Sequence, residues 1–337
     1  MNSILKWIII FESLAAVYSF EPVTMFALGS AVTSIFIATV AVLAPRPESS
    51  NRNTAQNQKA ESSNRNTAQN QKAEPSNPIT VLKRDAECSE DYYIERINKN
   101  NLEQNLNANV FGQEYAIKRI VKIVNSTIKE RETPLVMSFH GPTGTGKSYV
   151  FKIVANALFK NGTESKFVHF IYSQINYAVC TPELLPKIKT DLLDFIKNHN
   201  EKVGNQDYRK SIFIFLSNIG DDMIINRLVN HYKNKNTRET IPLTDIENSI
   251  PNIAAQSPGG FKNSKIISKS SISLYVPFLP LERKHVQQCA KKELEKRKIE
   301  ANSNNLNIVA NEMIYDQYKY FSTQGCKLIQ SKVVTLW

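Results

Sequence analysis

Two short apolar runs stand out in the part of the chain after residue 130. Leu135–Phe139 is followed by a glycine-rich loop and then by apolar residues at helical spacing up to Leu158. Ile212–Leu216 is a second apolar run, and it ends in the polar residues Ser217 and Asn218. Largely apolar runs of this length are typical of strands buried in a parallel sheet. Strands that alternate with helices predict an α/β fold with ligands at the carboxyl ends of the strands.

The remaining elements of the predicted globular part follow from the same spacing. Apolar positions in 101–128 predict helices that are interrupted by a turn at Phe111–Gln113. Thr181–Pro182 is typical of the N-cap and first position of a helix, which we expect to run to about His199. Leu281–Lys298 predicts a helix whose Lys and Arg residues are interleaved with Glu, as on a solvated surface. Other predicted elements are a strand at Phe167–Ile171 and lid segments at Asn311–Tyr320 and Gly325–Ser331.

The N-terminal region carries two hydrophobic segments. Residues 1–19 have the pattern of a secretory signal peptide, with Lys6 before an apolar core and a cleavage site at Val17–Ser19. Val23–Leu43, within segment 20–45, has no charged residue, and its 21 residues (43 − 23 + 1) span about 31 Å as a helix. Its Gly, Ser and Thr residues leave a monotopic hairpin or interfacial helix open, and a buried core helix is the remaining alternative. We expect this segment to associate with a membrane.

A direct repeat separates these segments from the globular part. Glu48–Ala60 reads ESSNRNTAQNQKA, and Glu61–Ala73 has the same sequence. A segment with no apolar residue larger than Ala does not bury enough surface to offset its ordering entropy. We therefore predict a disordered linker over 46–78, which leaves 79–275 for a large subdomain and 276–337 for a helical lid.

The glycine-rich loop has the composition of a phosphate-binding loop. Glycines have no Cβ and accept positive φ, so their N–H groups converge on phosphate oxygens, and the following helix adds its N-terminal partial charge. Lys147 is placed to reach the β- and γ-phosphates, and the Ser148 hydroxyl to reach Mg²⁺. We expect ATP and Mg²⁺ as cofactors, with ATP held by Gly141, Pro142, Thr143, Gly144, Thr145, Gly146, Lys147 and Ser148.

Composition narrows the class of protein only slightly. The chain has 337 residues, of which 42% are hydrophobic, which suffices for about two domains with substantial cores. The formal net charge of +11 is compatible with nucleic acid or an anionic membrane surface. Because the basic residues are scattered among acidic ones rather than grouped with aromatic residues, we expect no nucleic-acid binding.

Several motifs in this order resemble the torsin family, the branch of AAA+ ATPases related to the Clp/Hsp100 machines. The resemblance covers roughly 100–337. It implies a parallel P-loop sheet followed by a helical lid, in the lumen of the endoplasmic reticulum or the nuclear envelope. It also implies ATP-dependent remodelling of proteins or membranes. The motifs are Leu106-x-x-x-Val110–Gln113, the loop GPTGTGKS, Phe213–Asn218-x-Gly220, Val276–Glu282 and Gly325–Lys327.

The same resemblance assigns roles to particular residues and partners. It makes Asn218 the sensor-1 polar group and Lys327 the sensor-2 lysine. It implies a luminal membrane-protein activator, such as a lamina-associated polypeptide, that supplies an arginine finger. It is also compatible with a homo-oligomer.

The acidic pair that an ATPase of this class needs is absent from the sequence. Hydrolysis requires a strand that ends in Asp-Glu, the first to order Mg²⁺ and the second to activate water. Between Lys147 and Asn218, 71 positions apart (218 − 147), no apolar run ends in that pair. Asp207, Asp221 and Asp222 are candidate substitutes, although each also suits a solvated loop. We therefore expect a sheet that lacks one strand. The sequence leaves open whether the chain hydrolyses ATP, and the alternative function is an ATP-sensing scaffold.

Cysteines and glycosylation sequons add two further predictions. Four cysteines allow three full pairings, and the torsin resemblance implies a redox-active disulfide between Cys289 and Cys326, with two buried thiols as the alternative. Asn125–Ser126–Thr127 and Asn161–Gly162–Thr163 are N-glycosylation sequons. No Cys-x-x-Cys pair is present, and the five histidines are dispersed, so a separate metal site is not expected.

Overall fold

The computed structural model describes residues 39–43, 99–127, 133–159, 161–165, 167–171, 211–257 and 271–337. The predicted signal peptide, the repeat linker and the helix expected after Thr181 lie outside these residues, as do the first sixteen positions of the hydrophobic segment Val23–Leu43. Within the described part of the chain, no helix is long and apolar enough to cross a membrane.

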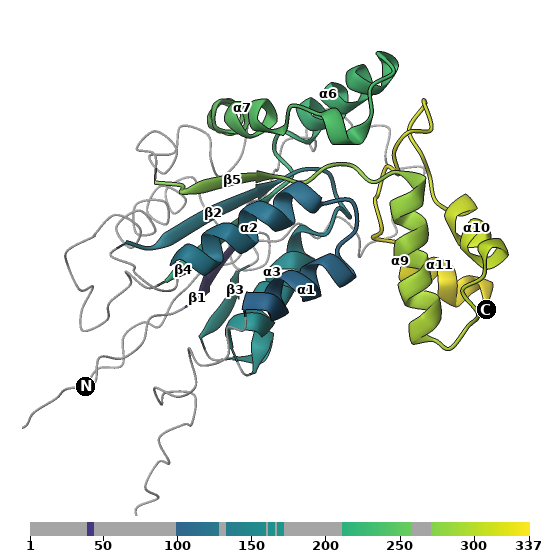
Figure 1. Cartoon of the computed structure of the whole chain (residues 1–337), viewed down its shortest axis with the longest axis horizontal. Helices are drawn as coiled ribbons and strands as arrows, with labels where there is room; N and C mark the ends of the chain where they lie inside the picture. The colour runs from purple at the N-terminus through teal and green to yellow at the C-terminus, as the bar shows by residue number, and fades with distance from the viewer. Residues whose placement is uncertain are drawn as a thin grey trace, which may run out of the picture.

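The centre of the fold is a parallel sheet built from the two apolar runs and a third strand (Figure 1). Strand β2 (Leu135–His140) lies between β4 (Ile212–Ser217) and β5 (Leu274–Pro277), and it is parallel to both. All six residues of β2 and all six of β4 are buried, which is why both runs are almost entirely apolar. The prediction of a parallel α/β sheet is confirmed.

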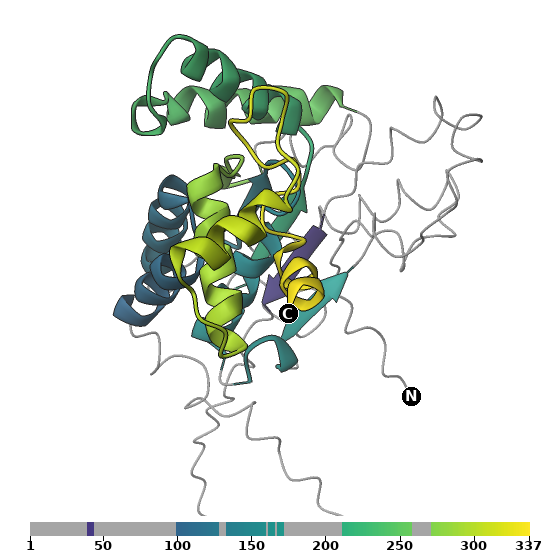
Figure 2. The ribbon, with the colours of Figure 1, turned by 90° about the vertical axis from the view of Figure 1, so that its right-hand side faces the viewer.

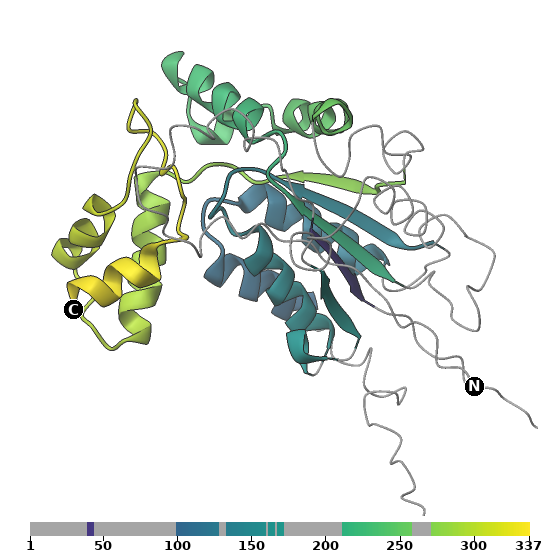
Figure 3. The same cartoon turned by 180° about the vertical axis from the view of Figure 1, so that it is seen from behind.

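Two further strands extend this sheet beyond β4, and one of them comes from far upstream. Strand β1 (Thr39–Leu43) pairs antiparallel with β4 on one side and with β3 (Val168–Ile171) on the other, which gives the order β3-β1-β4-β2-β5. The last five residues of the predicted membrane segment are therefore in the sheet. Since β1 is antiparallel to both neighbours, β3 runs parallel to β4 (Figure 3).

Helices α1 (Lys99–Asn109), α2 (Glu114–Thr127) and α3 (Lys147–Leu158) pack together on one side of the sheet (Figures 1 and 3). The predicted turn between α1 and α2 is present, with Gly112 at φ 68°. Helices α6 (Asp221–Lys233) and α7 (Leu243–Gln256) lie beyond the β5 edge. A continuous core joins α1, α2 and α3 to the strands, with Leu106, Ile120, Phe139, Phe151 and Ile214 among its fully buried members.

The C-terminal lid is a small helical unit with a core of its own (Figure 2). It contains α9 (Arg283–Lys296), α10 (Ser303–Asn311) and α11 (Ile329–Leu336). The predicted helix at Leu281–Lys298 corresponds to α9, which begins after the capping residue Glu282. The second lid helix lies earlier than the predicted segment Asn311–Tyr320, because the Asn302 side chain accepts a hydrogen bond from the N–H of Asn305 and starts α10 there.

Candidate nucleotide-binding site

The glycine-rich loop connects β2 directly to α3, and its glycines are required by geometry. Gly144 and Gly146 have φ values of 71° and 100°, which lie in the region that favours glycine. A Cβ on Gly141 would lie 2.1 Å from the carbonyl oxygen of Phe278, and one on Gly144 would lie 1.9 Å from that of Gln324. A residue with a side chain is therefore excluded at Gly141 and Gly144, because its Cβ would collide with a backbone carbonyl and its φ would be positive.

Lys147, the first residue of α3, is held at the centre of this loop. The residue is only 8% exposed. The ammonium group donates hydrogen bonds to the carbonyl oxygens of Gly141 at 2.6 Å and Pro142 at 2.7 Å. The hydroxyl of Thr145 also donates to the Pro142 carbonyl at 2.8 Å. A buried ammonium beside a helix N-terminus forms a strongly anion-attracting site.

A cavity of about 1300 Å³ brings the loop together with the residues assigned from the family resemblance. Asn218, which follows β4, and Lys327, in the turn before α11, both line it, as do Val110 and Phe111 from the turn before α2. Among the described residues of its lining, Glu293 is the one carboxylate, and it accepts a hydrogen bond from Arg297 at 2.7 Å. The lining therefore supplies lysines, hydroxyls and loop N–H groups, a set that suits a nucleotide triphosphate.

His140, the last residue of β2, connects the loop to the segment that carries Asn218, and the sequence analysis did not identify it. Its Nδ1 lies 2.9 Å from the Ile219 carbonyl, so Nδ1–H is the donor there, and the Ser138 hydroxyl lies 2.7 Å from Nε2, which accepts. Complete burial lowers the pKa of His140 to about 4. The hydrogen bond to the Ile219 carbonyl raises this pKa, and the charge of Lys147 lowers it further. A neutral His140 therefore aligns the two segments at physiological pH.

The lid touches the phosphate loop through backbone atoms. The N–H of Cys326 donates to the Gly144 carbonyl at 3.0 Å, and a Cβ on Gly325 would lie 2.3 Å from the same oxygen. Cys326 forms a disulfide with Cys289 of α9, so the predicted pairing is confirmed. The disulfide therefore links α9 to the turn that contacts the loop and carries Lys327.

A second set of contacts fixes the hinge between the large subdomain and the lid. The Gln113 side chain donates to the Leu279 carbonyl at 2.8 Å and accepts from the Leu279 N–H at 2.9 Å. Arg238, only 7% exposed, donates to the carbonyls of Gly112 and Pro280 and to Glu282, the N-cap of α9. One guanidinium therefore joins the turn before α2 to the start of the lid.

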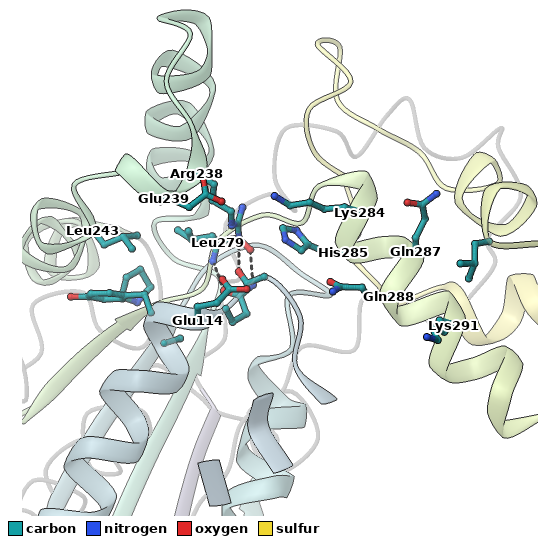
Figure 4. A pocket seen from close by; sticks show the side chains of 16 residues that line it. Glu114, Arg238, Glu239, Leu243, Leu279, Lys284, His285, Gln287, Gln288 and Lys291 are labelled. Atoms are coloured by element: carbon teal, nitrogen blue, oxygen red, sulfur yellow. Dashed lines mark hydrogen bonds between the residues drawn. The ribbon is translucent and has the colours of Figure 1, made fainter. Parts of the chain in front are cut away.

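Figure 4 shows a second cavity, of about 690 Å³, which Arg238 and Leu279 help to line. Burial, reinforced by the charge of Arg238, lowers the pKa of His285 on α9 to about 4. The cavity lies where α9 faces the start of α2, and no residue of the phosphate loop lines it. Its ionisable side chains are Glu114, Tyr115, Arg238, Glu239, Lys284, His285 and Lys291.

Two of the three candidate substitute carboxylates, Asp221 and Asp222, lie within the described residues. Asp221 and Asp222 open α6 immediately after Asn218 and Gly220. Burial raises the pKa of Asp221, the neighbouring Asp222 raises it further, and the charge of Lys147 opposes both. Asp222 is exposed, and Asp207 lies outside the described residues.

The two glycosylation sequons occupy different environments. Asn125 lies within helix α2, and its Oδ1 atom is buried. Asn161 is exposed, in the turn that follows α3. An exposed turn is more accessible to a glycosyltransferase than a helix interior, so Asn161 is the better of the two predicted acceptors.

The phosphate loop at the end of a parallel β-strand, the polar residue after the adjacent strand and the helical lid define a nucleotide-binding AAA+ protein. The chain belongs to the torsin family: the Torsin model matches residues 84–215, and the model of the Torsin-1A C-terminal domain matches residues 281–334. A "Torsin-like protein" of Drosophila melanogaster is 32% identical over 286 residues, which cover 73% of this chain and 84% of that protein. The resemblance stated from the motifs is confirmed.

Solved structures of Hsp104 are also similar to this chain. A closed-state Hsp104 with ATPγS and casein has a TM-score of 0.47 at 18% identity, with 73% of this chain and 47% of that chain covered. The Hsp104–ADP complex of S. cerevisiae has a TM-score of 0.45 at 20% identity, with 70% and 38% covered. The chain spans less than half the length of these Hsp104 chains.

Proposed function

We propose that this chain is an ATP- and Mg²⁺-binding torsin that holds nucleotide and signals its presence through the lid, without hydrolysing ATP on its own. The observation that carries the proposal is the cavity of about 1300 Å³ that joins the phosphate loop, Asn218 and Lys327. With ATP bound, the Lys147 ammonium, which now donates to the carbonyls of Gly141 and Pro142, would donate to phosphate oxygens instead. The Ser148 hydroxyl would be the side chain that holds Mg²⁺, and the ion would neutralise phosphate charge there.

The lack of hydrolysis is supported by the residues that follow the described parallel strands. In a parallel sheet, residues for ligand chemistry lie at the carboxyl ends of the strands. Strand β2 ends at His140 and leads into the phosphate loop, and β4 ends at Ser217 and is followed by Asn218. Among the described residues, neither an Asp to order Mg²⁺ nor a Glu to activate water directly follows these strands, so general-base catalysis lacks its usual carboxylate in this part of the chain.

We also propose a location in the endoplasmic reticulum lumen or nuclear envelope, associated with the membrane, and a partnership with a luminal activator. A disulfide is stable in an oxidising compartment, and Cys289–Cys326 is therefore consistent with the lumen. Membership of the torsin family supports an oligomeric AAA+ assembly. In such an assembly this chain acts in protein or membrane remodelling as an ATP-dependent binding subunit.

Nucleotide binding is tested by titrating the purified full chain with Mg-ATP in a calorimeter. Lys147→Ala is expected to weaken binding at least about tenfold, because one charge-assisted phosphate contact is worth more than about 1.4 kcal/mol. Lys152→Ala, an exposed position on α3, is the matched control and is expected to bind as the wild type does. Equal affinity in the Lys147→Ala chain would refute the proposed site.

The second candidate function is an ATP-hydrolysing torsin. It is favoured by the family membership itself, because the missing acidic pair is the one catalytic element not found in the sequence. Sequencing transcripts across Lys197–Ser211 separates the two functions. An additional in-frame segment ending in Asp-Glu would establish the hydrolytic form, and its absence from every transcript supports the binding form.

A further inference from the structure

A hairpin of the lid, residues 314–323, lies between α10 and the turn that carries Lys327. Its two arms are joined by a β-bridge between Tyr315 and Ser322. Asp316 closes the turn at its tip, because Asp316 Oδ1 accepts hydrogen bonds from two backbone N–H groups, at 2.7 and 3.2 Å. Figure 2 shows this lid hairpin, in yellow, reaching from the lid towards α6 and α7.

One side of the lid hairpin packs into the large subdomain. Phe321 is only 2% exposed and belongs to a hydrophobic cluster with Leu228 of α6 and Ile246 of α7. The ring of Tyr232 on α6 has its centroid 5.3 Å from that of Phe321 and 5.5 Å from that of Tyr320. Aromatic rings at these separations attract one another. We call Tyr232, Tyr320 and Phe321 the aromatic clasp, because they fasten the lid hairpin to α6.

Polar contacts accompany the aromatic clasp. The Tyr232 hydroxyl donates a hydrogen bond of 2.9 Å to Glu282, the N-cap of α9. Burial raises the pKa of Tyr232, and the charge of Glu282 raises it further, so the hydroxyl keeps its proton and acts as the donor. The neighbouring Lys233 ammonium lies 4.2 Å from the centre of the Tyr318 ring and donates to the Tyr318 hydroxyl at 2.9 Å. Tyr232 therefore connects α6 both to the lid hairpin and to the start of α9.

The two elements that the clasp joins both lead to the nucleotide cavity. Asn218 lies three residues before the start of α6 (221 − 218), and Lys327 lies four residues after the lid hairpin (327 − 323). Both residues line the cavity of about 1300 Å³. Between the hairpin and Lys327, the N–H of Cys326 donates to the Gly144 carbonyl of the phosphate loop at 3.0 Å. A hairpin that is fixed to α6 therefore fixes the backbone of Lys327 relative to the phosphate loop.

Lys327 is exposed, and a lysine is a point charge on a flexible four-carbon chain. Ordering such a side chain opposes binding, and a backbone that is already in place reduces that cost. We propose that the aromatic clasp positions Lys327 for the terminal phosphate of ATP and thereby makes the chain prefer ATP to ADP. This inference rests on the proposed nucleotide site. Tyr232 acts as a positioning residue, because no member of the clasp lines the cavity.

Titration of the full chain with Mg-ATP and with Mg-ADP in a calorimeter tests the clasp. Tyr232→Ala and Tyr320→Ala each remove one ring of the clasp. Each is expected to weaken ATP binding at least about fivefold and ADP binding less than about twofold, because ADP lacks the phosphate that Lys327 would contact. Lys327→Ala is expected to show the same pattern. Tyr320 is partly exposed, so its variant keeps the test decisive if Tyr232→Ala does not fold.

Two variants serve as matched controls. Tyr232→Phe keeps the ring and loses only the hydrogen bond to Glu282, so it is expected to retain most of the preference for ATP. Ile314→Ala changes a side chain of the same hairpin that is 66% exposed, and it is expected to bind both nucleotides as the wild type does.

The outcomes separate the clasp from the nucleotide site. An unchanged ATP-to-ADP affinity ratio in Tyr320→Ala, or in Lys327→Ala, would refute the clasp as a positioning device and leave the site standing. Equal losses of ATP and ADP binding in a folded Tyr320→Ala chain would refute it as well. A wild type that binds neither nucleotide would refute the proposed site itself, and the inference with it.

Hydrogen exchange of the wild-type chain provides an independent test. Coupling is reciprocal, so a clasp that favours ATP by a given factor is itself stabilised by ATP by the same factor. The amides of Tyr320 and Phe321, which donate to Asp316, are expected to exchange at least about fivefold more slowly with Mg-ATP than with Mg-ADP. The amides of α10 are the internal control and are expected to exchange equally. Equal exchange of the hairpin amides with both nucleotides would contradict the clasp.

Discussion

Replacing His140 with Asn is expected to remove a defined part of the acid sensitivity of the fold. The Asn amide occupies the place of Nδ1 and donates to the Ile219 carbonyl as the imidazole does. It has no group that takes up a proton between pH 5 and 7.5. The variant therefore keeps the contact between β2 and the Ile219 carbonyl in the segment after Asn218, and it loses the proton-binding site.

The size of the effect follows from the difference between the folded and unfolded pKa values. Burial lowers the pKa of His140 from 6.5 to about 4, so below pH 6.5 the unfolded chain binds a proton that the folded chain does not. His140 therefore contributes stability that is present above pH 6.5 and is lost as the pH falls toward 4. Between pH 7.5 and pH 5 the wild type is expected to lose about 2 kcal/mol of unfolding free energy through this group.

Urea denaturation of the full chain at pH 7.5, 6.5, 5.5 and 5.0 measures this contribution. The His140→Asn chain is expected to lose about 2 kcal/mol less than the wild type across that range. His285, whose pKa is also lowered to about 4, titrates equally in both proteins and cancels in the comparison. His231→Asn, at a partly exposed position on α6, is the matched control. Parallel curves for the wild type and His140→Asn would refute the assigned burial and protonation state.

Three further substitutions test the lid and its hinge. Gln113→Ala removes the side-chain partner of both backbone groups of Leu279 and is expected to lower the free energy of unfolding by about 2–4 kcal/mol, as measured by thermal denaturation. Gln288→Ala, at an exposed site, is the control and is expected to have no effect. Arg238→Met breaks the ion pair with Glu282 and is expected to lower the free energy of unfolding by about 3 kcal/mol. Arg227→Met, at an exposed position, is the control. An unchanged thermal midpoint in Arg238→Met would contradict the hinge contacts. Cys289→Ser removes a cross-link over 37 residues and is expected to destabilise the lid by about 4 kcal/mol, and reductant should shift the wild type but not the variant.

The sequence predicted the elements whose signals are local. The apolar runs that became β2 and β4 are fully buried strands, and the glycine-rich loop between β2 and α3 is recognisable from residues within one short segment. Helix α9 was predicted at Leu281–Lys298, and it lies within two residues of the expected ends. Such features depend on neighbours in the chain, so an isolated sequence contains the information.

The features that the sequence did not predict depend on contacts between distant segments. The partner of β4 comes from residues 39–43, and an apolar segment of this kind fits a strand, a core helix or a membrane equally well by composition. Arg238 and Gln113 are ordinary polar residues until the fold surrounds them with carbonyl groups of the hinge. His140 similarly follows an apolar run without any motif, and only its burial between Ser138 and Ile219 reveals its role.

Single-turnover hydrolysis is the most direct test of the central claim that this chain binds ATP without cleaving it. The full chain, loaded with [γ-³²P]ATP and Mg²⁺ and mixed with the luminal domain of a lamina-associated polypeptide, is followed for phosphate release. Lys147→Ala gives the background, and Asp221→Asn tests the half-buried carboxylate nearest in sequence to Asn218. The wild type is expected to retain bound ATP and to release phosphate no faster than Lys147→Ala. Phosphate release that is well above this background would contradict the account, and its loss in Asp221→Asn would identify the carboxylate responsible.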